Sequence, residues 1–193
     1  RASCLGHSSG RLAMLTHQQA RIAKSLWLRH YREHFLATLE REIAAHRAFA
    51  ELRGMRAGFR LNGASDFPWE RWCDVSGGGF YDYTKAPART RPATAGYHLT
   101  YSLSERPESM SEALAWLGSG RNAAIVVRDR ALAEECVGRG LYGFGCVDGD
   151  ETDARFDDPP AKWVVLYAKG AARKDSSGFV RDRDALTFGG VAP

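Results

Sequence analysis

The stretch NAAIVVRD, residues 122–129, decides the fold class of this chain. Its apolar residues form an unbroken run, and KWVVLYAKG, residues 162–170, repeats the pattern. A strand with one solvated face alternates apolar and polar residues, whereas unbroken apolar runs are typical of strands that are covered on both faces in a parallel sheet. The two stretches therefore predict an α/β fold with a mostly parallel sheet.

Four further β-like runs end in polar residues in the same way: GFRLNGASD (58–66), GFYDYTK (79–85), YHLTYSLSE (97–105) and FGCVDGD (144–150). Helix candidates separate some of these runs. Ser109 and Glu112 have the spacing of a capping box, and Asp129 can cap the helix that follows it. The implied order of strand, helix and strand favours a partial or irregular (β/α) barrel.

The N-terminal part of the chain is predicted to be helical. Neither Pro nor Gly occurs from Thr16 to about Arg53, so one long helix or two in sequence should end at Gly54. A chain of 193 residues has room for one domain. We expect a single α/β domain over 1–193, with a Cys/Gly/Ser loop (1–15), a helical part (16–54), a strand-rich barrel part (58–170) and a tail (171–193) that partly wraps over the barrel.

Composition limits the classes of partner. The formal net charge of +4 is too mild for a dedicated nucleic-acid binder, although it permits a polyanionic partner. No apolar run approaches the roughly 20 residues that span a bilayer, and no signal-peptide pattern is visible, so we expect a cytoplasmic chain without a membrane partner. Because the chain opens with Arg1 inside its first motif, we also expect residues upstream. The cysteines show no CxxC spacing, and three of them are predicted to be buried: Cys73, Cys136 and Cys146.

Polar residues follow the predicted strands, where ligands bind in parallel α/β proteins. They are Asn62, Ser65, Asp66, Asp82, Thr84, Lys85, Thr100, Ser102, Arg128, Asp148, Asp150 and Lys169. Turn formation is the alternative explanation for the short polar residues, but it does not account for Lys85, Arg128 or Lys169. The pattern therefore predicts one polar pocket. We expect a common cleft to be lined by Asn62, Asp66, Asp82 and Lys85.

The chain resembles an uncharacterised family of phage and plasmid proteins, the gene product 88-like group. The resemblance covers nearly the whole chain, in RASCLGHSSGR, QQARIAKSLWL, RLNGASDFPWE, FYDYTK, YHLTYSLSE, VDGDETDARFDDP and AKGAARKDSSGFV. Members start with a segment of the type C-x(6)-GC-x(3)-CL, of which only the last cysteine is matched here, by Cys4. The resemblance implies a phage- or plasmid-type protein of unknown role.

The order of parts is also distantly similar to the partial barrel of radical S-adenosylmethionine enzymes. This likeness implies a [4Fe–4S] cluster with Cys4 as a ligand. It also implies S-adenosylmethionine at Asn62, Gly63, Ser65 and Asp66, with Asp82, Lys85, Arg128 and Lys169 acting on the substrate. The CxxxCxxC motif of those enzymes is absent, so further thiolate ligands would have to lie upstream of Arg1.

Two alternatives stay open. The first is a non-catalytic accessory protein that binds a host protein or nucleic acid through basic helices around Arg21, Lys24, Arg29 and Arg32. The second concerns Asp148, Asp150 and Asp153, where a divalent cation is less favoured than a solvated acidic turn because the segment departs from the EF-hand pattern.

Overall fold

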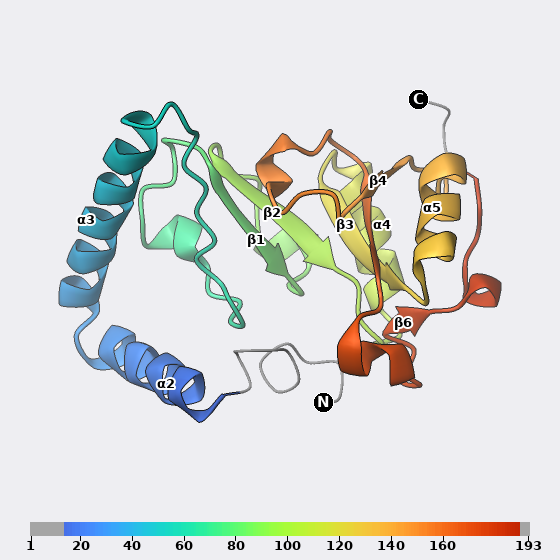
Figure 1. Cartoon of the computed structure of the whole chain (residues 1–193), viewed down its shortest axis with the longest axis horizontal. Helices are drawn as coiled ribbons and strands as arrows, with labels where there is room; N and C mark the ends of the chain where they lie inside the picture. The colour runs from blue at the N-terminus through green and yellow to red at the C-terminus, as the bar shows by residue number, and fades with distance from the viewer. Residues whose placement is uncertain (1–13, 190–193) are drawn as a thin grey trace.

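The computed structural model of the chain describes residues 14–189, and a six-stranded sheet forms its centre (Figure 1). The strands are β1 (Phe80–Thr84), β2 (Tyr97–Ser102), β3 (Asn122–Val127), β4 (Cys146–Asp148), β5 (Trp163–Tyr167) and β6 (Val180–Arg181). Their order is β1-β2-β3-β5-β4, with β6 also paired to β3, and every strand pair is parallel. The predicted mostly parallel α/β fold is confirmed, and the sheet does not close on itself, which is consistent with the predicted partial barrel.

Within residues 14–189, two α-helices precede the sheet, which is one of the two arrangements predicted for the N-terminal part. Helix α2 (Leu15–His30) and helix α3 (Arg32–Glu51) meet at Tyr31, and the chain turns at Gly54, whose φ of +64° favours glycine. Figure 1 shows both helices at the end of the molecule next to β1, away from α5.

Helices α4 (Ser109–Gly118) and α5 (Arg130–Arg139) follow β2 and β3. The predicted cap of α5 is confirmed, because the Asp129 side chain accepts a 2.9 Å hydrogen bond from the Leu132 amide. The predicted capping box of α4 is wrong. Ser109 lies inside the helix, buried, and its hydroxyl accepts a 2.8 Å hydrogen bond from the Ser104 amide. The N-cap residue of α4 is Glu108, whose side chain makes no capping hydrogen bond.

The connections cover both faces of the sheet. The connections through α4 and α5 both lead toward the β4 edge of the sheet, whereas the connection from β4 to β5 leads back toward β3. Because crossovers between parallel strands are right-handed, connections that run in opposite directions lie on opposite faces of the sheet. The rings of Tyr101 and Trp116 of α4 lie 6.0 Å apart on the first face. The ring of Phe156, in the short helix η4 (Arg155–Asp157), lies 5.7 Å from Tyr81 on the second face. Burial on both faces explains the unbroken apolar runs of β3 and β5.

The expected strand at 58–66 is reduced to a single parallel bridge between Phe59 and Phe80. The Phe59 amide donates to Gly79, and Phe59 in turn accepts from Tyr81. The chain then leaves the sheet, and the Asn62 side chain bonds to the backbone amide and carbonyl of Phe67, as a turn-forming side chain does.

The tail contributes a strand that the sequence did not predict. Strand β2 pairs with the first half of β3, up to Ser102 beside Ala124. Strand β6 pairs with the second half, with Val180 beside Val126. Since β3 has β5 on its other side, β2 leaves β3 at the point where β6 takes its place.

Two of the three cysteines predicted to be buried, Cys73 and Cys136, are buried, whereas Cys146 is half-buried; all three are free thiols. Over residues 14–189, none of the helices combines the length and apolar character needed to cross a membrane.

Candidate functional site

The parallel strands bring their carboxyl ends to one edge of the sheet, hereafter the carboxyl edge. As predicted, Lys85, Arg128 and Lys169 lie there, just after β1, β3 and β5. The predicted polar residues near this edge lie in separate groups, each with its own hydrogen bonds. We describe these groups in turn, because their contacts decide what each can bind.

Asp82 does not lie at a strand end. It is in the middle of β1 and fully buried, because side-chain alternation puts it on the covered face with Phe80 and Thr84. Its carboxylate accepts from the Asn62 amide (2.9 Å) and from the Tyr97 hydroxyl (2.6 Å). Burial raises the pKa of Asp82 to about 6, although both hydrogen bonds favour the ionised form. The contacts of Asp82 are those of an interior group, and its predicted part in catalysis stays a prediction.

Asn62 organises the loop that follows the Phe59 bridge. Its Oδ1 accepts from Ser65 Oγ, the Phe67 amide and Trp69 Nε1, and its Nδ2 donates to the Phe67 carbonyl, all within 2.8–3.0 Å. Asn62 is also buried, and these bonds hold its side chain within the loop, so the expected contact to S-adenosylmethionine stays a prediction. Gly63 and Ser65 are exposed, and their binding role stays a prediction.

Asp66 holds this loop to the end of β1. One carboxylate oxygen accepts from Thr84 Oγ1 (2.9 Å) and from the Lys85 amide (2.8 Å), and the other accepts from Arg91 (2.9 Å). Arg91 is buried and also forms a two-bond ion pair with Glu70, at 2.7 and 3.0 Å. Sequence reasoning missed Arg91 and Glu70 because neither follows a strand.

The four residues expected to line a common cleft form two hydrogen-bonded pairs. Asn62 bonds to Asp82, and Asp66 bonds to Lys85. Asn62 and Asp82 are buried, whereas Asp66 and Lys85 are exposed, and a cleft lined by all four stays a prediction.

Three cations converge at the carboxyl end of β2. Lys85 Nζ lies 3.3 Å from both the carbonyl oxygen and the hydroxyl of Ser102. Arg106 Nε donates to Ser104 Oγ (3.3 Å), and Arg181 Nη2 donates to the Ser104 carbonyl (3.0 Å). We call Lys85, Arg106 and Arg181 the cation cluster. Of these three residues, only Lys85 was predicted. Arg106 lies in a loop and Arg181 in β6, and both come close to Lys85 only when the chain is folded.

The acidic segment after β4 forms a turn. The Asp150 amide donates to Asp148 Oδ1 (2.8 Å), and the Asp150 carboxylate accepts from Lys169 Nζ (2.7 Å) and the Tyr167 amide (3.2 Å). These contacts bring the predicted residues Asp150 and Lys169 together. No group of three or more His, Cys, Asp or Glu side chains within 14–189 is arranged to hold a metal ion, and the cation at Asp148, Asp150 and Asp153 stays a prediction.

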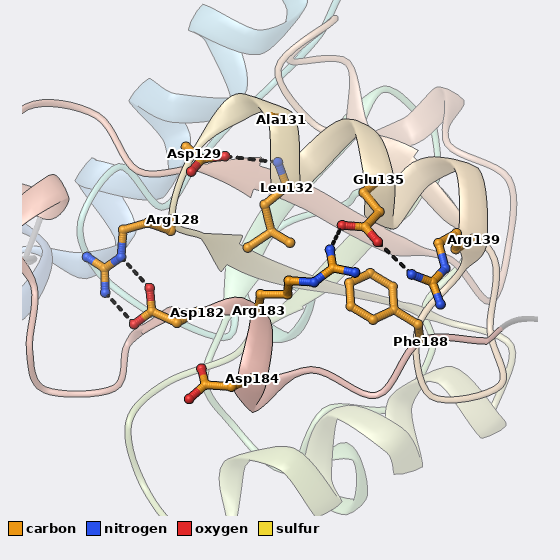
Figure 2. A pocket seen from close by; sticks show the side chains of 10 residues that line it. All are labelled: Arg128, Asp129, Ala131, Leu132, Glu135, Arg139, Asp182, Arg183, Asp184 and Phe188. Carbon is orange, nitrogen blue, oxygen red and sulfur yellow. Dashed lines mark hydrogen bonds and ion pairs between the residues drawn. The ribbon is translucent and has the colours of Figure 1, made fainter.

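A cleft of about 820 Å³ lies between α5 and the chain that follows β6 (Figure 2). Arg128 stands at one end and forms a two-bond ion pair with Asp182, at 2.7 and 2.9 Å. Figure 2 shows Glu135 between Arg183 and Arg139, bonded to both. Each of the three arginines therefore already holds a carboxylate. The cleft contains Arg128 but is distinct from the pocket that the sequence predicted.

Cys4, the proposed cluster ligand, lies outside the described residues.

A family model described as gene product 88 matches residues 1–183. The chain belongs to the gene product 88 family. This membership confirms the family resemblance noted in the sequence. No curated protein and no solved structure matches this family member. The likeness to radical S-adenosylmethionine enzymes has no support in the family match and stays a hypothesis.

Proposed function

We propose that this gene product 88 protein binds a small anionic ligand, of the phosphate or carboxylate class, at the cation cluster. The observation that carries the proposal is the convergence of Lys85, Arg106 and Arg181 on Ser102 and Ser104. These bonds end on carbonyl and hydroxyl oxygens of Ser102 and Ser104. In the cleft beside α5, by contrast, the bonds of each arginine described above end on a carboxylate.

The ion pair that Arg106 forms is weak. Arg106 pairs with Glu108 at 3.3 Å, with 46% and 57% of the two side chains exposed, and exposed pairs of this kind contribute about 0–1 kcal/mol. An incoming phosphate or carboxylate could therefore compete for Arg106. The guanidinium offers paired N–H donors and the ammonium a compact charge, which are the groups that proteins use for such anions.

The position supports the same function. The cluster lies where β2 leaves β3 and β6 takes its place, at the carboxyl edge, where parallel α/β proteins bind ligands. The ring centroid of Phe179 lies 5.5 Å from Lys85 Nζ and gives the cluster an apolar neighbour.

The experiment is calorimetric titration of the full chain with inorganic phosphate, pyrophosphate and succinate in separate arms, which distinguish the two anion classes. We expect Lys85→Met to weaken binding of the preferred probe by about tenfold or more. The matched control is Lys174→Met, which removes an exposed lysine elsewhere on the surface. Binding should also weaken at higher salt. Equal affinity of the parent and Lys85→Met, or no binding of any probe by the parent, would overturn the proposal.

A further inference from the structure

The exposed apolar side chains of this protein are concentrated on the two N-terminal helices. Within residues 14–189, eight of the nine large hydrophobic side chains that are exposed lie on α2 and α3 or beside their ends: Met14, Leu15, Ile22, Leu26, Tyr31, Phe49, Leu52 and Met55. The ninth is Val137 on α5. We call residues 15–51 the helical arm. A concentration of this kind marks an interaction surface, because single exposed apolar residues are normally scattered.

Helix α2 carries a stripe of large residues. Leu15, Ile22 and Leu26 are 68%, 60% and 49% exposed, and their spacing of seven and four residues puts them on one face of the helix. Other faces hold the intramolecular contacts, since Leu28 is buried and the Trp27 ring lies 5.0 Å from that of Phe35. We call the three exposed residues the α2 stripe.

Helix α3 carries a stripe of small residues with the same spacing. Ala37, Ala44 and Ala48 are all exposed and share one face, which we call the α3 stripe. The opposite face packs on the core through Leu36, Leu39, Ile43 and Ala50. Each stripe spans eleven residue steps, or about 16 Å along its helix.

The two helices also differ in charge. Within its bounds α2 has Arg21, Lys24 and Arg29 and no carboxylate. One flank of the α3 stripe is acidic, because Glu33, Glu40 and Glu51 have a spacing of seven and eleven residues and lie along that flank. Of the three cations, Arg29 lies beside the α2 stripe, whereas Arg21 and Lys24 lie toward the opposite side of the helix. Large residues facing small ones, with Arg29 facing the acidic flank, give the helix pair complementarity in size and charge.

We propose that two copies of the chain associate through the arm, with the α2 stripe of one copy on the α3 stripe of the other. Applied twice around a two-fold axis, this contact closes a dimer. A pairing of α2 with α2 is disfavoured because it would bring like charges together. A nucleic acid would satisfy the cations but not the three large aliphatic side chains. The inference is independent of the anion site.

Sedimentation equilibrium of the full chain over a wide concentration range tests this proposal. We expect the parent to reach twice the chain mass of 21.3 kDa. Ile22→Glu and Ala44→Lys should each give the mass of a single chain, because one alters the α2 stripe and the other blocks the α3 stripe. Val137→Glu is the matched control, since it places a carboxylate at the exposed apolar position outside the arm, and it should stay a dimer.

Circular dichroism melting checks that each variant is folded. We expect Ile22→Glu and Ala44→Lys to fold because both residues are exposed. A parent that stays monomeric overturns the proposal. The α2 stripe would then have a different occupant, such as residues 1–13, a membrane surface or another molecule. A dimer that survives Ala44→Lys but not Ile22→Glu also overturns it, because that result assigns the contact to α2 alone.

Discussion

The hydroxyl of Tyr97 lies 2.6 Å from a carboxylate oxygen of Asp82, and both side chains are buried between β1, β2 and the loop above them. Burial raises the pKa of Asp82 to about 6, above its ordinary value of 3.8. The folded protein therefore holds this proton more tightly than the unfolded chain does. The stabilisation is complete below about pH 4 and is lost as the pH rises through 6.

We expect the free energy of unfolding of the parent, relative to Asp82→Asn, to fall by up to about 3 kcal/mol between pH 4 and 8. Urea denaturation at a series of pH values measures it. Asp74→Asn, at an exposed carboxylate, should leave the parent's pH dependence unchanged in this range. Parallel curves for the parent and Asp82→Asn would contradict the assignment.

The buried ion group around Arg91 should be critical for stability. Arg91→Ala leaves Glu70, whose side chain is 3% exposed, without its cation, and breaking a buried pair in this way costs about 3–5 kcal/mol. The control is Arg89→Ala, since Arg89 is 75% exposed in its pair with Glu112 and should cost at most about 1 kcal/mol. Chemical denaturation measures the loss of unfolding free energy in both variants. Equal losses would show that the buried pair contributes no more to stability than the exposed one.

Asn62 should matter through its hydrogen bonds. Asn62→Ala removes the acceptor of the Phe67 amide and of Trp69 Nε1, and a buried donor left without a partner costs about 1–3 kcal/mol. We expect a total loss of at least about 2 kcal/mol in the free energy of unfolding. Ser65→Ala removes one part-buried bond to the same side chain, made by an exposed residue, and should cost less than about 1 kcal/mol. A larger cost for Ser65→Ala would reverse this interpretation.

Nucleic-acid binding should be weak and sensitive to salt, because the cations of α3 are interleaved with Glu33, Glu40 and Glu42. Fluorescence anisotropy with duplex DNA at about 50 and about 200 mM salt measures the effect. We expect most of the affinity to be lost at the higher concentration. Tight, sequence-dependent binding that persists there would place the protein in a different class.

The iron–sulfur hypothesis depends on Cys4. Reconstitution of the full-length natural protein with iron and sulfide, followed by visible absorption, compares Cys4→Ala with Cys73→Ala. Burial raises the pKa of the Cys73 thiol to about 11, so Cys73 is a poor thiolate ligand and a suitable control. Loss of the chromophore in Cys4→Ala alone supports the hypothesis. Absence of a chromophore from the parent, or its equal retention in both variants, removes it.

The sequence predicted those parts of the fold that follow from local pattern. The runs in β3 and β5 identified the parallel sheet because burial on both faces favours apolar residues at successive positions of a strand. Asp129 identified the start of α5 because a cap acts within one turn of helix. The run at 58–66 was overestimated because the Asn62 side chain, and not the backbone pattern, decides where the chain leaves the sheet.

The site was harder to predict because it depends on segments that are distant in the sequence. Lys85 was identified from its place after β1, but Arg106 and Arg181 join it only through the folded chain. β6 has two residues and no periodicity to detect. Asp82 was misplaced because a polar residue within a strand resembles the polar residues that end one.

The pairing of β6 with β3 has a consequence for how the molecule assembles. Strand β3 is central, yet its second half has no partner on one side until Val180 and Arg181 arrive from the far end of the described chain. During synthesis that backbone is available to strands of other molecules, which is how exposed strands start aggregation. A chain interrupted before Val180 should therefore be prone to aggregate, even though it retains most of the apolar core.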